Sequence, residues 1–188
     1  MVKSPAYLDE PELQVAPLDE LLEPFRQLVG PDFDGYRNHC RRVFLFCTAF
    51  VEQSDETARM KIAIAAAFHD LGIWTEGSFD YIEPSCRLAG KQLEATGQTE
   101  WREEIQAMIR QHHKIRPYQA NPSWLVEQFR KADWIDISKG MLRHKLKDSY
   151  VVDVLDTFPN EGFHQALIRL GAAWMKSHPF NLLPMFRF

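Results

Sequence analysis

An imidazole and a carboxylate stand side by side at the end of an apolar run, as the pair His69–Asp70. The run from Ile62 to Phe68 is apolar almost all round, which predicts a helix buried inside the protein. Two ionisable groups at the end of a buried helix are costly in free energy unless a binding partner is present. A divalent cation is such a partner, because it compensates the carboxylate charge and accepts a lone pair from a neutral imidazole. The dipeptide alone also fits an ordinary buried histidine followed by an aspartate that caps the helix.

Further ionisable residues share predicted apolar helix faces. At 100° per residue, helical spacing places His39, His112 and Asp133 among apolar side chains. A lone core histidine is usually satisfied by a backbone carbonyl, but with the His69–Asp70 pair there are five such residues on four predicted helices. One ion bound where the helices meet would satisfy most of them together. Imidazoles and carboxylates form a mixed nitrogen and oxygen ligand set, which suits Mn²⁺, Fe²⁺, Co²⁺, Ni²⁺ or Zn²⁺.

These residues must be positioned by helices, because apolar residues recur at helical spacing along most of the chain. The predicted helices cover about residues 18–29, 33–53, 55–70, 84–96, 99–112, 123–139, 148–157 and 160–177. Ser54-Asp55 is expected to cap one helix and Thr99 another, and residues 73–83 are the least regular stretch. The sequence shows no strand-like alternation of useful length and no internal repeat.

The pattern predicts an all-α fold, a single-domain helical bundle of about seven to eight helices over residues 18–188. Residues 1–17, which contain three prolines, predict an irregular N-terminal arm. The apolar C-terminus, PFNLLPMFRF, is expected either to pack back on the domain or to form a contact in a homodimer.

Composition narrows the class of protein. The chain has 188 residues, of which 45% are hydrophobic and 26% charged, a balance typical of a globular domain. Its net charge of −4 argues against a dedicated nucleic-acid binder, which usually carries a basic excess. No apolar run approaches a membrane span, so we expect no membrane contact. Cys40 and Cys47 lie about 10 Å apart along one predicted helix, too far for a disulfide. Free thiols fit a reducing compartment, and the expected location is cytoplasmic.

The order His39, then His69–Asp70, then Asp133 resembles the HD-domain superfamily of metal-dependent phosphohydrolases. The flanking segments YRNHCRRV, AAAFHDLG and FRKADWIDIS are similar too, and the resemblance covers roughly residues 30–140. It implies a helical bundle that holds one divalent transition metal through His39, His69, Asp70 and Asp133. It also implies hydrolysis of a phosphomonoester or phosphodiester in a small phosphorylated molecule, often a nucleotide, by a metal-activated water.

The stretch HHKIRP supplies candidates for the rest of such a site. His112 and His113 are candidates for proton transfer to the leaving group, and family members with a second metal often place one or two histidines in this interval. His112 also fits a hydrogen-bonded core histidine, and in a continuing helix His113 would point about 100° away from the apolar stripe. Lys114 and Arg116 are candidate phosphate contacts, although a charged loop is more often simply solvated.

The chain departs from the better-known branches of this superfamily. Di-iron oxygenases on the same fold resemble H…HD…H…H…D, but the interval FDYIEPSCRLAG contains no histidine. Glu83 or Asp80 could stand in there, and Glu83 is a further candidate for substrate binding. The nucleotidase branch has a glutamate where this chain has Ile73. The leading hypothesis is therefore a phosphohydrolase of open substrate, with an iron-dependent oxygenase and a metal-containing binding or regulatory module as alternatives.

Two more charged residues lie close to the predicted ligands. Asp136 is about 60° from Asp133 on the same predicted helix, where it either accepts a hydrogen bond from a ligand histidine or caps a solvated edge. Arg42 lies on the shoulder of the His39 face, a position that favours a surface ion pair over a phosphate contact.

Overall fold

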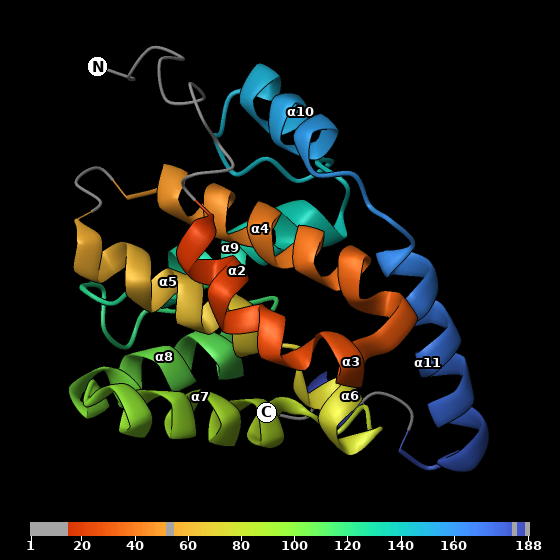
Figure 1. The fold of residues 1–188 in the computed structure, drawn as a ribbon. Coiled ribbons are helices and arrows are strands. Elements are labelled where there is room, and N and C mark those ends of the chain that lie inside the picture. The colour runs from red at the N-terminus through yellow and green to blue at the C-terminus, as the bar shows by residue number, and fades with distance from the viewer. Residues whose placement is uncertain (1–14, 52–54, 182–183, 187–188) are drawn as a thin grey trace.

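The computed structural model describes residues 15–51, 55–181 and 184–186, and within these ranges every regular element is a helix (Figure 1). Seven of the described α-helices have at least ten residues: α4 (Phe33–Ala49), α5 (Glu56–Phe68), α7 (Ile82–Thr96), α8 (Arg102–Gln111), α9 (Val126–Ile137), α10 (Asp148–Thr157) and α11 (Phe163–Ser177). The short elements are α2 (Ala16–Leu22), η2 (Glu23–Phe25), α3 (Arg26–Val29), η3 (Gly30–Asp32), α6 (Gly72–Glu76), η4 (Thr99–Trp101) and η5 (Pro184–Phe186). The predicted all-α fold is confirmed.

Helix α5 is the centre around which the other helices pack. Every residue from Ile62 to Phe68 is buried, because α2, α4, α7 and α8 all contact this helix. Helix α4 packs along α9, α7 pairs with α8, and α8 also contacts α9 (Figure 1). Helices α10 and α11 lie at the periphery of this group. The C-terminal end of α5 is therefore surrounded by protein, and ionisable groups placed there are withdrawn from water.

A capping aspartate and a glycine of positive φ account for two of the helix ends. The side chain of Asp55 accepts a hydrogen bond from the backbone N–H of Ala58 at 2.7 Å, as its predicted capping role requires. Gly97, with φ of +72°, ends α7. Thr99 is not the predicted side-chain cap, because it begins the 3-10 turn η4 and α8 starts only at Arg102.

Other boundaries differ from the predictions. Helix α4 ends at Ala49 instead of near residue 53, and residues 52–54 lie outside the described part. Helix α6 falls in the stretch 73–83 that was expected to be irregular, since five residues are too few to show helical periodicity. Helix α2 begins at Ala16, inside the predicted arm, whose residues 1–14 lie outside the described ranges.

The cysteines and the C-terminus also bear on the predictions. Cys40, Cys47 and Cys86 are buried thiols without a disulfide in the described structure. Part of the C-terminal segment packs back on the domain, because Met185 is buried while Phe180 is fully exposed. Residues 182–183 and 187–188 of that segment lie outside the described ranges, and the homodimer stays a prediction.

A glycine in α4 lets the connection between α10 and α11 lie directly on the helix. A Cβ atom on Gly35 would meet the carbonyl oxygen of Glu161 at 2.7 Å and the backbone nitrogen of Phe163 at 3.0 Å. This close approach brings the Phe163 ring onto the His39 ring, with centroids 4.1 Å apart and planes at 14°. Gly35 thus allows a C-terminal residue to cover a histidine of the central helices.

We expect Gly35→Ala to destabilise the protein by about 1–3 kcal/mol, because the new methyl group collides with backbone atoms that cannot rotate away. Gly90→Ala in the middle of α7 is the matched control, since the nearest atom outside the backbone of α7 would be Gln106 Nε2, 3.6 Å from the new Cβ. It should stabilise the protein by about 0.5–1 kcal/mol, the usual helix preference for alanine. Chemical denaturation measures both. If the two substitutions changed the free energy of unfolding in the same direction and by the same amount, the close approach at Gly35 would be contradicted.

Candidate metal centre

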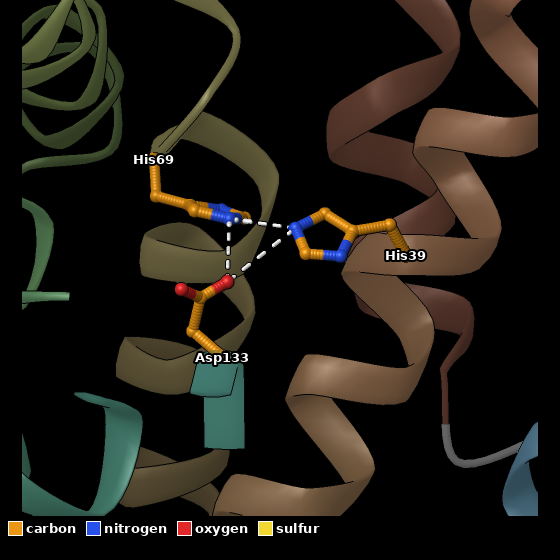
Figure 2. A group of neighbouring side chains, drawn as sticks. All are labelled: His39, His69 and Asp133. Carbon is orange, nitrogen blue, oxygen red and sulfur yellow. Dashed lines mark hydrogen bonds and ion pairs between the residues drawn. The ribbon is translucent and has the colours of Figure 1, made fainter. Parts of the chain in front are cut away.

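Side chains from three parts of the chain converge at the buried end of α5 (Figure 2). The Nε2 atoms of His39, from α4, and His69, which follows α5, are 2.9 Å apart. The Oδ1 atom of Asp133, from α9, lies 3.7 Å from each of these nitrogens. All three side chains are at most 3% exposed. The structure thus brings together three residues that lie far apart in the sequence.

Hydrogen bonds on the far side of the two rings fix which nitrogen carries the proton. His39 Nδ1–H donates to Asp136 Oδ2 at 2.6 Å, and His69 Nδ1–H donates to the carbonyl of Ala66 at 2.9 Å. Both Nε2 atoms therefore present lone pairs, and these lone pairs face each other across 2.9 Å. Two acceptors at this distance repel each other unless a positive charge lies between them.

Asp70 and His112 extend the same cluster. Asp70 Oδ2 lies 3.5 Å from His69 Nε2, and Asp70 Oδ1 lies 3.4 Å from His112 Nε2. His112 Nδ1–H donates to the carbonyl of Ile109 at 2.6 Å. Burial by itself would lower the pKa of His112, but the carboxylates of Asp70 and Asp133 outweigh burial and raise it. Within the described structure, Asp70 Oδ1, Asp133 Oδ1 and His112 Nε2 are buried atoms without a hydrogen-bond partner. Burial of three such atoms in one place is unfavourable by several kcal/mol in the absence of a cation.

The pKa shifts of the clustered residues are consistent with a site that binds a cation. Burial lowers the pKa of His69 to about 3, so its imidazole is neutral and its lone pair is available. Burial raises the pKa of Asp133 to about 7, because a second carboxylate in this apolar surrounding lacks sufficient compensation. For Asp70, burial alone would raise the pKa, but His69 and His112 outweigh it and hold the pKa well below its usual range. A neutral His69 beside the undercompensated carboxylate of Asp133 fits a divalent transition metal.

The donor atoms form three overlapping groups, each able to hold a cation, within which they lie no more than 4.8 Å apart. These groups are His39–His69–Asp133, His69–Asp70–His112 and His112–His113–Asp133. The structure therefore brings all four predicted ligands, together with His112, into one cluster. It contains donors for one ion, and a second ion would need a ring nitrogen of His113 that carries no proton and accepts no hydrogen bond.

His113 turns toward this cluster, although a continuing helix would have pointed it elsewhere. Helix α8 ends at Gln111, so the 100° spacing no longer applies to His113. Its ring centroid lies 3.8 Å from that of His112, and its Nε2 forms a hydrogen bond with the hydroxyl of Tyr81. Burial and the neighbouring His112 hold the pKa of His113 well below its usual range. Sequence reasoning did not identify Tyr81, because only the turn after α8 brings His113 to its hydroxyl group.

His113 also lines an open cleft of about 680 Å³ beside the cluster. Lys114 and Arg116 line the same cleft, as expected of residues that contact a substrate. Glu83 is elsewhere: its carboxylate accepts hydrogen bonds from Arg110 at 2.7 and 3.0 Å on the outside of α7 and α8. Among the described residues, Glu83 belongs to none of the groups that could hold an ion. The geometry gives no support to Glu83 as a substitute for a missing histidine ligand.

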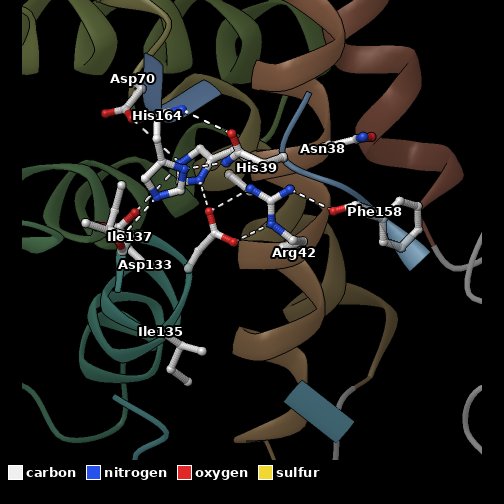
Figure 3. Close-up of polar contacts among 12 residues, drawn as sticks. Asn38, His39, Arg42, Asp70, Asp133, Ile135, Ile137, Phe158 and His164 are labelled. Atoms are coloured by element: carbon white, nitrogen blue, oxygen red, sulfur yellow. Dashed lines mark hydrogen bonds and ion pairs between the residues drawn. The ribbon is translucent and has the colours of Figure 1, made fainter. Parts of the chain in front are cut away.

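A buried ion pair between Arg42 and Asp136 supports the His39 ring on its Nδ1 side, away from the cluster (Figure 3). Arg42 donates to both oxygens of Asp136, with an Nη2–Oδ2 distance of 2.9 Å, and its Nη1 donates to the carbonyls of Phe158 and Pro159. Burial by itself would raise the pKa of Asp136, but Arg42 outweighs burial and keeps the pKa far below its usual range. Asp136 is thus the charged hydrogen-bond acceptor of His39, and not the cap of a solvated edge. The expected surface position of Arg42 is wrong, since only 1% of this residue is exposed.

A family model for the HD domain matches residues 36–154, well over half of the chain. The chain belongs to the HD domain family. Comparison with curated proteins and with solved structures finds no significant match. The HD match contains all six histidines and aspartates of the cluster, and membership indicates a protein of the metal-dependent phosphohydrolase type. Across the described ranges, no helix has both the length and the apolar character needed to cross a membrane.

We expect divalent metal to raise the melting temperature of the protein by an amount that depends on Asp133. At a metal concentration about 100-fold above Kd, binding stabilises the folded state by about 2.7 kcal/mol. Asp133→Asn should lose most of this response, and its metal-free form should be more stable than metal-free wild type by about 1 kcal/mol, because a buried charge is gone. Asp19→Asn, which breaks the ion pair with Arg41 elsewhere on α4, should keep the full response. An unchanged response in Asp133→Asn would contradict the site.

The orienting role of Arg42 is tested by two neighbouring conservative substitutions. Arg42→Lys keeps the charge but cannot hold both oxygens of Asp136, so metal affinity should fall about 10- to 100-fold, the usual effect of losing support behind a histidine ligand. Arg41→Lys loosens the equivalent contact with Asp19 and should change affinity less than about twofold. Competition with a chelator of known affinity measures both values, after circular dichroism has confirmed folding. Equal affinities in the two variants would exclude this role.

Proposed function

We propose that the protein is a metal-dependent hydrolase that cleaves a phosphomonoester or phosphodiester of a small molecule with water. One observation supports this most directly: buried imidazole and carboxylate acceptors converge without a countercharge, beside a cleft that His113 also lines. His39, His69, Asp70 and Asp133 would hold the ion. When bound, a divalent cation there would lower the pKa of a water and stabilise charge on a phosphoryl oxygen.

The chain's own groups can assist departure of the alcohol. Burial raises the pKa of Tyr81 well above its usual value, so the phenol keeps its proton and donates a hydrogen bond to His113 Nε2. His113 then carries its own proton on Nδ1, and we propose that this N–H donates a hydrogen bond to the leaving oxygen. His112, whose Nε2 faces Asp70, would take part as a ligand of a second ion or as a substrate contact.

The cleft residues would bind the rest of the substrate. Lys114 directly follows His113 in the turn after α8 and lines the cleft, and we propose that its side chain contacts the reacting phosphate. Walls formed by residues 111 and 113–120 would hold the organic part of a small phosphorylated molecule. The described helices offer no membrane-spanning element, and the net charge of −4 still argues against nucleic acid as the main partner.

Two alternative functions, an iron-dependent oxygenase and a metal-containing binding or regulatory module, would use the same helices. An iron-dependent oxygenase of this fold would need a further ligand in the stretch that contains Glu83, whose carboxylate is held by Arg110. A binding or regulatory module would keep the ion without turnover. Neither alternative gains a specific observation from the structure, and both give results that differ from those of a hydrolase.

The test begins with elemental analysis of the purified protein, followed by a screen of phosphate monoesters and diesters with Mn²⁺, Fe²⁺, Co²⁺, Ni²⁺ and Zn²⁺. We expect hydrolysis that a chelator abolishes and that metal restores. Asp70→Asn should lower kcat/KM at least about 100-fold, since it removes a ligand and a charge from the centre. Asp153→Asn on the exposed side of α10 is the matched control and should retain full activity.

Three outcomes would contradict the proposal. Wild-type activity in Asp70→Asn would show that another enzyme in the preparation is responsible. Two irons per chain with consumption of O₂ would favour the oxygenase. Metal binding without cleavage of any ester would favour the binding module.

A further inference from the structure

The cleft beside the cluster is much larger than the reacting group alone requires. Its volume is about 680 Å³, within the range of sites that enclose whole small molecules. A water molecule takes up about 30 Å³ in the liquid, so one phosphoryl group would fill only a small part of this space. Most of the cleft must therefore face a part of the substrate that does not react.

The charge of the cleft wall is positive. Lys114 and Arg116 are among the lining residues, and no aspartate or glutamate is. Arg116 is exposed and forms no ion pair with a carboxylate of the described residues. The nearest carboxylate that contacts this loop is Glu127, which already accepts hydrogen bonds from Arg130 and from the backbone N–H of Tyr118. The charge of Arg116 is thus available to a ligand.

The loop that carries Arg116 is held to α9 by hydrogen bonds on both sides of Arg116, at Lys114 and at Tyr118. Arg130 Nη1 donates to the carbonyl of Lys114 at 3.0 Å, and Glu127 accepts from Tyr118 N–H at 2.8 Å. Arg130 and Glu127 bind each other through two further hydrogen bonds of 2.8 Å, and Arg130 is only 5% exposed. An ion pair between buried Arg130 and partly buried Glu127 therefore holds residues 114–118 in place, with Arg116 at the middle of the span. The cleft is formed before any ligand binds.

Arg116 is displaced from the reacting position. Arg116 lies three positions after His113, and the Cα atoms of an extended chain span at most about 10 Å over that length. Between the two positions the cleft is lined by Ile115, which is 79% exposed, and beyond Arg116 by Pro117 and Tyr118. Along this wall Lys114 directly follows His113, Arg116 lies three positions after His113, and apolar side chains lie between and beyond them.

We propose that the substrate is a phosphate ester with a second anionic group, and that Arg116 binds this second group. This inference rests on the proposed function, because it takes the buried cluster as the place where the ester is cleaved. The second group is a phosphate or a carboxylate, joined to the reacting phosphate by a spacer that packs on the apolar wall.

The test compares matched ligands of graded chain length: α,ω-alkanediol bisphosphates, ω-phosphoalkanoic acids and the corresponding alkyl monophosphates. Hydrolysis by metal-loaded protein and calorimetric binding are measured in parallel. At the best length, kcat/KM for a doubly anionic ligand should exceed that for the monophosphate about tenfold, the effect of one charge-assisted hydrogen bond. Whichever doubly anionic series shows this preference identifies the second group.

Substitutions of Arg116 test whether this residue causes the preference for doubly anionic ligands. Arg116→Gln should reduce the tenfold ratio to nearly one, and Arg116→Lys should retain part of it because the charge remains. Arg87→Gln, the same change at an exposed arginine of α7 that does not line the cleft, should leave the ratio unaltered.

The outcomes separate this inference from the proposed function. Hydrolysis of monophosphates with no preference for a second anionic group, or a preference that survives Arg116→Gln, would overturn the inference and leave the hydrolase intact. Binding that depends on Arg116 without cleavage of any ester would uphold the anionic site and overturn the hydrolase. Absence of both cleavage and preferential binding would overturn both.

Discussion

The rest of the structure depends on a set of buried lone pairs that face one another without a countercharge. Hydrogen bonds to Asp136 and to the Ala66 carbonyl leave the Nε2 atoms of His39 and His69 as acceptors at 2.9 Å. Two buried carboxylates, Asp70 and Asp133, are in contact with them. Such a cluster opposes folding unless a cation is bound, because each buried unsatisfied polar group is unfavourable by about 1–3 kcal/mol. The helices hold it in place through the burial of a large apolar core on every side.

Much of the support for this cluster comes from the segment after the HD match, which ends at residue 154. The carbonyls of Phe158 and Pro159 receive hydrogen bonds from Arg42, and the ring of Phe163 stacks on His39. This segment can reach α4 because Gly35 has no side chain. The C-terminal helices therefore help to fix the orientation of a candidate ligand, in addition to covering the core.

Helical periodicity was sufficient to predict the helices and the burial of five ionisable residues, because it identifies the buried face of a helix. The resemblance to the HD-domain superfamily then selected His39, His69, Asp70 and Asp133 among them as ligands of one ion. Sequence reasoning was insufficient wherever a contact depends on distant chain segments. Arg42 is buried because Asp136 lies against it from 94 positions further along the chain. His113 turns inward because α8 ends two residues before it, and helix ends are the least certain part of a prediction from periodicity. Glu83, likewise, could not be assigned to Arg110 without knowing how α7 and α8 pair.

The most direct test of the account is a crystal structure of the protein grown with Mn²⁺ or Zn²⁺, with anomalous diffraction recorded at the absorption edge of the metal. The account predicts an anomalous peak enclosed by the Nε2 atoms of His39 and His69 and the carboxylates of Asp70 and Asp133. It also predicts that these two nitrogens lie further apart than 2.9 Å once an ion separates them. No peak at this position, with the metal bound instead to exposed histidines such as His178, would contradict it.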